Sequence, residues 1–152
     1  MRKMIAIVSA LLIMAALTGC GSSGFSADKL TISEYNDAEV NTQVQLFIKQ
    51  KTMTSNTQEA AAAIVNLTDK EFTFDAVQRL EVKLDGKWYI VPDSQEGIAP
   101  AVIYNLPAER TEEAMLYFGE RYGELPQGEY RVLKRFAGPD GETAIASAEF
   151  KI

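Results

Sequence analysis

The sequence predicts an all-β fold, an antiparallel β-sandwich of about seven short strands, and three observations support this fold class. Several stretches of the chain alternate apolar and polar residues with a period of two, which is typical of half-buried strands. The pair Asp85-Gly86 separates two such stretches, and this pair favours the two-residue turn of a β-hairpin. Further turn-forming residues recur at short intervals, as they do in sandwiches.

The N-terminal 19 residues are predicted to form a signal helix that is removed from the mature protein. Arg2 and Lys3 precede an almost wholly apolar run over residues 4–16, and small residues follow this run. The run is shorter than the roughly 20 apolar residues that a membrane-spanning helix needs. We therefore interpret residues 1–19 as a signal peptide and not as a transmembrane helix.

The end of this segment resembles the lipobox of bacterial lipoproteins. The matching residues are Leu17, Thr18, Gly19 and Cys20. The resemblance implies cleavage before Cys20, the only cysteine of the chain, and a diacylglycerol group on its thiol. Because two acyl chains anchor a protein stably, we expect it on the extracytoplasmic face of the cell membrane, with the membrane as a partner through the lipid on Cys20.

The mature chain is expected to consist of a flexible tether over residues 20–29 and one domain over residues 30–152. The tether is rich in small and polar residues, which is typical of flexible linkers. A domain of this length can bury about two-thirds of the surface that its unfolded chain exposes.

The composition excludes several classes of function. The chain contains no histidine, so neither a Ser-His-Asp triad nor a zinc site with histidine ligands can form. The formal net charge is −6 and no basic block is present, which argues against nucleic-acid binding. We expect no catalytic residue, no metal and no cofactor. The acidic residues weighed for catalysis are Asp93, Glu96, Glu109, Glu112 and Glu113, and solvated surface is the expected place of all five.

The first half of the domain contains three stretches with strand character. Residues 42–54 alternate, with the apolar side chains of Val44, Leu46 and Ile48 on one face. Residues 59–66 contain alanines that favour a helix, but the stretch is short and ends in Ile64-Val65, which favours a strand. Residues 79–91 are predicted to form the hairpin around Asp85-Gly86.

The second half is predicted to begin with a long connection over residues 92–107 that contains a short strand at 101–104. Residues 111–122 could form a helix or a strand, and Gly119 and Gly123 favour the strand because they would interrupt a helix. The remaining predicted elements are a turn at 125–130, a strand at 130–136, a hairpin loop at 137–142 and a final strand at 144–152.

Three stretches in this order resemble the bacterial Ig-like domain family that occurs in lipoproteins. They are VNLTD at 65–69 with FTF at 72–74, DGKWY at 85–89, and YGELPQGEYR at 122–131. The similarity covers about residues 43–152 and implies an immunoglobulin-like sandwich without an established catalytic site. We expect Trp88 to fill the core between the sheets. Tyr130 resembles a tyrosine corner, whose hydroxyl bonds a backbone group upstream.

Two functions remain open at this point. The first is a non-catalytic binding or scaffolding module that recruits a protein by strand addition at a sheet edge. The second is a protease-inhibitor-like module, because a family of bacterial proteinase inhibitors also has an Ig-like sandwich; residues 92–107 would then be the inhibitory loop.

Four aromatic residues could form an exposed patch, and at least half of them are expected in the core: Tyr104, Tyr117, Phe118 and Tyr122.

Overall fold

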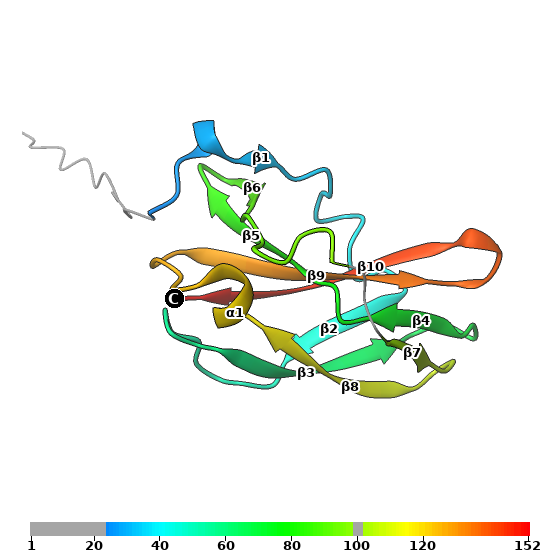
Figure 1. Ribbon diagram of the computed structural model, residues 1–152. Coiled ribbons are helices and arrows are strands. Elements are labelled where there is room, and N and C mark those ends of the chain that lie inside the picture. Colours follow the sequence, from blue (N-terminus) through cyan, green and yellow to red (C-terminus); the bar gives the residue numbers. More distant parts are fainter. Residues whose placement is uncertain (1–23, 99–101) are drawn as a thin grey trace, which may run out of the picture.

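The computed structural model describes residues 24–98 and 102–152. In this part of the chain, ten strands form two antiparallel sheets that pack against each other (Figure 1). This arrangement confirms the predicted all-β sandwich. Cys20, the other lipobox residues and the predicted signal peptide lie outside the described residues. Among the described residues, no helix has the length and apolar character needed to cross a membrane.

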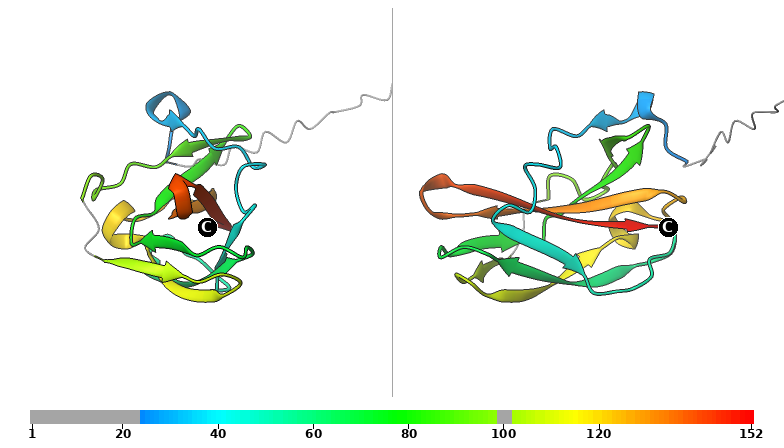
Figure 2. Two further views of the ribbon diagram at one scale, coloured as in Figure 1. Left: turned by 90° about the vertical axis from the view of Figure 1, so that its right-hand side faces the viewer. Right: turned by 180° about the vertical axis from the view of Figure 1, so that it is seen from behind.

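One sheet has seven strands and the other has three. The larger sheet runs in the order β1-β6-β5-β9-β4-β7, with β10 also paired to β9, and the smaller sheet runs in the order β2-β3-β8. Figure 2 shows the domain from two further directions. The strands are β1 (Thr31–Ile32), β2 (Val44–Ile48), β3 (Glu59–Asn66), β4 (Phe72–Asp75), β5 (Arg79–Leu84), β6 (Lys87–Ile90), β7 (Ile103–Leu106), β8 (Thr111–Tyr117), β9 (Glu129–Ala137) and β10 (Thr143–Lys151). The helical turns are η1 (Ala27–Lys29), α1 (Gly119–Tyr122) and η2 (Pro139–Gly141).

A cluster of buried apolar side chains fills the space between the sheets. The larger sheet contributes Phe72, Leu80, Val82, Tyr130, Val132 and Phe136, and the smaller sheet contributes Val44, Leu46, Ala60, Ala62, Ile64 and Leu116. These side chains come from every second position of their strands, so the period of two in the sequence marks the face that meets the core. Burial of each large apolar side chain stabilises the fold by about 1.5–3 kcal/mol.

Strand β9 pairs with different strands along its two sides. It pairs with β10 over its whole length. On the other side it pairs with β5 as far as Leu133 and with β4 only at Ala137. Within the described chain, residues 134–136 therefore have no partner strand on that side. The interruption lies beside the candidate site below.

The predicted hairpin is present as β5 and β6. The backbone φ angles of Asp85 and Gly86 are 49° and 75°, which are the positive values that a type I′ turn requires. Strand β3 also has the predicted bounds, although alanine favours helices. It lies between β2 and β8 in the smaller sheet, and this tertiary pairing overrides the helix propensity.

Several boundaries differ from those predicted. Strand β2 covers only part of 42–54, because the last backbone hydrogen bond to β3 is donated by Lys49 and the chain then turns at Thr54. The strand predicted at 101–104 is β7, which lies slightly later in the chain. Residues 111–122 contain both alternatives, β8 and then the single turn α1. Gly119 begins this turn where the side chain of Gln58 occupies the space of a Cβ atom.

Strands β1 and β4 were not predicted, and β1 belongs to an N-terminal segment that covers the larger sheet. Strand β1 pairs with β6 at the sheet edge. Residues 33–41, here called the N-terminal strap, then cross the outer face of this sheet toward β10, where the amide of Asn41 donates to the carbonyl of Ile145 (Figure 1). Within the expected tether of residues 20–29, Phe25 packs against the core cluster.

Candidate functional site

A buried ion pair holds the N-terminal strap on the larger sheet. Arg131 on β9 and Glu81 on β5 are register partners, and Nε of Arg131 donates to Oε2 of Glu81 at 2.7 Å. Both side chains are 0% exposed. The guanidinium also donates to Oδ1 of Asp37 and to the carbonyl of Tyr35, while the Ser33 hydroxyl donates to the other oxygen of Glu81. These bonds offset the desolvation of the two charges.

Trp88 lies against this ion pair and not between the two sheets. The register pairs it with Lys83 on the outer side of the hairpin, and the Arg131 guanidinium lies 4.6 Å from its ring centroid. The indole N–H donates to Oδ1 of Asp37 at 3.2 Å. The residue is only 7% exposed, so the strap buries it. Its neighbour Tyr89 packs against the core, because successive residues of a strand face opposite sides.

Tyr130 belongs to the core cluster and has the contacts of a tyrosine corner. Its hydroxyl donates to the carbonyl of Pro126, four residues upstream, at 2.6 Å. Burial raises the pKa of Tyr130 to about 12. The ring stacks on Phe150 and meets Phe25 edge-on, with centroid distances of 5.4 and 6.5 Å. Tyr130 therefore connects the N-terminal segment to the core.

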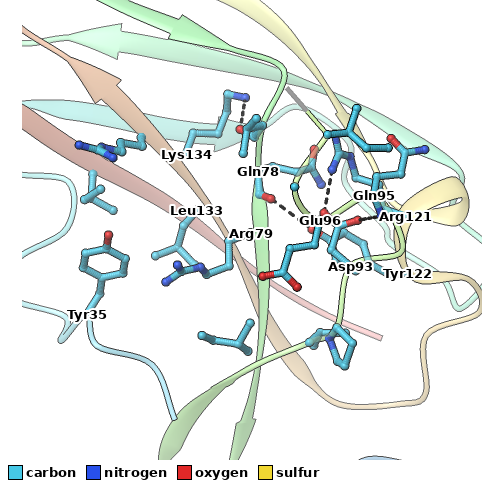
Figure 3. Close-up of a pocket in the computed structure, with 18 residues that line it drawn as sticks. Tyr35, Gln78, Arg79, Asp93, Gln95, Glu96, Arg121, Tyr122, Leu133 and Lys134 are labelled. Atoms are coloured by element: carbon cyan, nitrogen blue, oxygen red, sulfur yellow. Dashed lines mark hydrogen bonds and ion pairs between the residues drawn. The ribbon is translucent and has the colours of Figure 1, made fainter. Parts of the chain in front are cut away.

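A pocket of about 460 Å³ opens beside the strap on the outer face of the larger sheet (Figure 3). Leu133 and Ile145 line it from the sheet, Tyr35 from the strap, and residues 91–93 and 95–98 from the opposite side. Arg121 and Tyr122 of α1 complete the lining. Ligand sites in proteins typically enclose about 300–1,000 Å³, so the volume is sufficient for a small molecule or the end of a peptide.

An ion pair fixes the far wall of this pocket. Arg121 donates to Oδ2 of Asp93 at 2.7 Å, and both side chains are largely buried. The amide of Ser94 donates to the carbonyl of Arg121, and its hydroxyl donates to the carbonyl of Glu120. The segment that follows β6 is thereby attached to α1. Burial also raises the pKa of Tyr122, whose hydroxyl donates to the carbonyl of Gln78.

Lys134 shares the core-facing side of β9 with Val132 and Phe136, and it borders the pocket where the pairing of β9 is interrupted. Its Nζ donates to the carbonyls of Asp75 and Val77 at 2.7 and 2.9 Å. The residue is only 2% exposed, and burial lowers the pKa of Lys134 to about 8. It forms no ion pair with any residue that the structure describes. Lys134 is thus a buried cation whose partners are two neutral carbonyl groups and the ring of Phe74, whose centroid lies 5.8 Å from Nζ.

Strand β7 forms an exposed, uncharged edge of the larger sheet. It pairs with β4 on one side, and it ends the strand order on the other. Ile103 and Tyr104 are 60% and 48% exposed, and Ile98 and Val102 are exposed nearby in the chain. The Tyr104 ring stacks on Phe74 with a centroid distance of 5.3 Å. Apolar side chains therefore gather along an edge whose backbone groups have no partner strand among the described residues.

The acidic residues considered for catalysis and the aromatic residues considered for an exposed patch lie in different parts of the structure. Asp93 is in the pocket wall, Glu96 lines the same pocket with its side chain exposed, and the other acidic residues weighed lie on or beside β8. Within the described ranges, no group of three or more acidic side chains could hold a metal ion. Of the four aromatic residues, Phe118 is fully buried and Tyr122 is partly buried, whereas Tyr104 and Tyr117 are exposed.

Three buried charged residues were missed in the sequence. Arg131 and Glu81 occupy outward positions of their strands, where a charged residue is ordinarily solvated, and only the strap makes them buried. The sequence contains a weak indication for Lys134, because this residue stands between Val132 and Phe136 at a position where the alternation would place an apolar residue. A lysine at a core position indicates that a buried cation has a specific set of partners.

A family model described as bacterial Ig-like domain matches residues 40–151. Among solved structures, the archaellum periplasmic stator protein FlaG from Sulfolobus acidocaldarius is similar, with 16% identity and a TM-score of 0.37 over 70% of this chain and 99% of that chain. The PmoD soluble domain from Methylocystis sp. has 13% identity and a TM-score of 0.29 over 82% of this chain and 98% of that chain. No curated protein matches the sequence.

Proposed function

Because the chain belongs to the bacterial Ig-like domain family, we propose that it is a lipid-anchored extracytoplasmic protein whose Ig-like domain binds a protein partner without catalysis. The lipobox residues Leu17, Thr18, Gly19 and Cys20 support the anchor. The observation that carries the binding role is the open apolar edge formed by β7. The two parts of the proposal are tested separately.

The contacts of Phe25 support a position close to the membrane. Phe25 packs on the core beside Tyr130, and only four residues separate it from Cys20. An extended chain spans at most about 3.6 Å per residue, so a lipid on Cys20 would lie within about 18 Å of this end of the sandwich. The opposite end of the sandwich would point away from the bilayer.

Strand β7 has the properties of an edge that accepts another strand. Its four residues include neither a charge nor a proline, the features that commonly protect sheet edges. The edge of β8 differs, because it carries Glu112 and Glu113 and the side chain of Gln78 pairs with the backbone of Tyr117 in both directions. Strand addition to β7 would pair its open backbone groups and cover Ile103 and Tyr104.

The test of this function is site-specific photo-crosslinking on intact cells of the source bacterium. A photo-reactive amino acid replaces Tyr104 in one strain and the exposed Lys87 in a control strain. We expect a discrete protein adduct from position 104 only, and loss of this adduct when Ile103→Lys places a charge on the edge. The same adducts from both positions, or none from position 104, would contradict the binding role of β7.

A protease-inhibitor function is the alternative, and the attachment of Asp93 and Ser94 to α1 favours it, because inhibitory loops must be held rigidly. The predicted inhibitory loop covers residues 92–107, of which 99–101 lie outside the described residues. A panel of serine, cysteine and metalloproteases titrated with the purified protein separates the two functions. Stoichiometric inhibition that is reduced by Ile98→Ala would support the inhibitor function. Protease rates that the protein does not change would exclude inhibition of these proteases and favour the binding function.

A further inference from the structure

We propose that the pocket beside the N-terminal strap binds a carboxylate that carries an apolar group, with the carboxylate held at Lys134. This site is distinct from the anchor at Cys20 and from the edge strand β7. The chemical class of the ligand is inferred from the charge, the hydrogen-bonding capacity and the apolar lining of the pocket.

The side chains that line the pocket carry a net positive charge, whereas the chain as a whole is negative. The chain has a net charge of −6, yet four basic and two acidic side chains line the pocket: Arg79, Arg121, Lys134 and Arg135 with Asp93 and Glu96. Two of the basic side chains are already neutralised, since Arg121 pairs with Asp93 and Arg79 pairs with Glu34. Lys134 and Arg135 form no ion pair with any described residue. An anionic ligand is therefore favoured over a cationic one.

Lys134 retains hydrogen-bonding capacity after its contacts with the protein are made. An ammonium group has three N–H donors, and two of them are directed to the carbonyls of Asp75 and Val77. The Phe74 ring centroid lies 5.8 Å from Nζ, and this ring accepts no conventional hydrogen bond from the third donor. Asp75 favours the charged form of Lys134 electrostatically and Arg121 disfavours it, and the larger effect of burial lowers the pKa of Lys134 to about 8. A carboxylate on the third donor would supply the counter-charge that the described chain does not place there.

The rest of the lining is suited to an apolar group. Leu133 and Ile145 project from the sheet, and Ile90, Val91 and Tyr35 add apolar surface around them. An aliphatic or aromatic substituent would be buried against these side chains (Figure 3). Such pockets bind ligands through an apolar lining and a few placed polar groups. The end of a peptide and a free organic acid both present this combination of groups.

The test compares two probes that differ only in charge, N-acetylleucine and N-acetylleucinamide. The full chain is reconstituted in phosphatidylcholine nanodiscs and labelled with ¹³C at the lysine ε position. We expect the acid to shift the Lys134 signal saturably and to raise its pKa, and the amide to bind roughly tenfold more weakly. Equal binding of acid and amide, or no binding of either, would overturn the proposal.

A third probe distinguishes the two sources of the carboxylate. The acetylated tripeptide Ala-Ala-Leu with a free C-terminus is compared with N-acetylleucine. Tighter binding of the tripeptide assigns the site to a chain terminus, and equal binding assigns it to a small organic acid. Both results require the carboxylate and support the proposal.

Two substitutions test whether Lys134 causes the preference for the acid over the amide. Lys134→Met should remove the difference between acid and amide, whereas the control Lys51→Met, which changes an exposed lysine, should preserve it. Retention of the full preference in Lys134→Met would contradict the assignment. If Lys134→Met does not fold, the titration of Lys134 in the unsubstituted protein still decides, because a pKa that the acid does not raise excludes direct contact. None of these results depends on the binding role of β7.

Discussion

Nε of Arg131 lies 2.7 Å from Oε2 of Glu81, and neither side chain reaches solvent. The pair joins β9 to β5, and the same guanidinium binds the N-terminal strap through Asp37 and Tyr35. The strap, in turn, buries Trp88 and forms one side of the pocket. A buried ion pair of this kind therefore connects the packing of the sheet to the shape of the candidate site.

Removal of the acid from this pair should destabilise the protein strongly. Glu81→Ala leaves the Arg131 charge buried without its counterion, which lowers the free energy of unfolding by about 3–5 kcal/mol. The control Glu59→Ala changes an exposed residue and should lie within about 0.5 kcal/mol of the unsubstituted protein. Urea denaturation measures both values. A similar small effect for the two variants would show that the pair contributes little.

Trp88→Ala should loosen the strap as well as lower the global stability. Loss of a buried tryptophan lowers the free energy of unfolding by about 3–5 kcal/mol. Because Trp88 lies beneath the strap, hydrogen exchange at the amides of residues 33–41 should accelerate more than exchange at β3. The control Trp88→Phe keeps a ring beneath Arg131 and should preserve most of the protection. Equal acceleration at β3 and at the strap would place the ring in the core instead.

Tyr130→Phe should cause a smaller loss. The substitution removes the hydrogen bond to the carbonyl of Pro126 and keeps the ring, so the free energy of unfolding should fall by about 0.5–1.5 kcal/mol. Tyr104→Phe is the matched control, because the Tyr104 side chain is exposed and should tolerate the change. Thermal denaturation followed by circular dichroism compares the two. A melting temperature of Tyr130→Phe equal to that of the control would contradict the tyrosine corner.

The buried ammonium of Lys134 should make stability rise with pH above neutrality. Burial lowers the pKa of Lys134 to about 8 in the folded protein, from its ordinary value of 10.5. Between these values the unfolded chain binds more protons than the folded one, so raising the pH from about 7 to about 9.5 should add about 2 kcal/mol to the free energy of unfolding. Lys134→Met should lack this rise. Parallel pH profiles of the two proteins would contradict the lowered pKa.

The sequence was most informative where a local rule acts alone. The turn residues Asp85 and Gly86 determined the hairpin, and the alternation in β2 and β5 identified the core face. The extra strands β1 and β4 are too short to show a period, and they form because neighbouring strands supply hydrogen-bonding partners. For 111–122, both alternatives were partly right because a single helical turn follows the strand.

The candidate site was less accessible from the sequence because it depends on register and on contacts distant in the chain. Trp88 was expected in the core, but the sequence does not show which residues of β6 face the core. The register shows this, because the core residue Val82 pairs with Tyr89 and Trp88 therefore faces the opposite side. The burial of Arg131 requires a strap from about 90 residues earlier in the chain. The environment of Lys134 requires the interruption between β4 and β5, which no local pattern encodes.

Intact mass spectrometry of the membrane-extracted protein tests the lipid anchor most directly. The proposal predicts a mature chain that begins at Cys20 and carries a diacylglycerol group on the sulfur. Cys20→Ser should abolish both the lipid and the cleavage before position 20, while the folded domain retains its circular dichroism spectrum. A mature protein that begins elsewhere, or that carries a free thiol on Cys20 while it stays in the membrane fraction, would contradict the anchor.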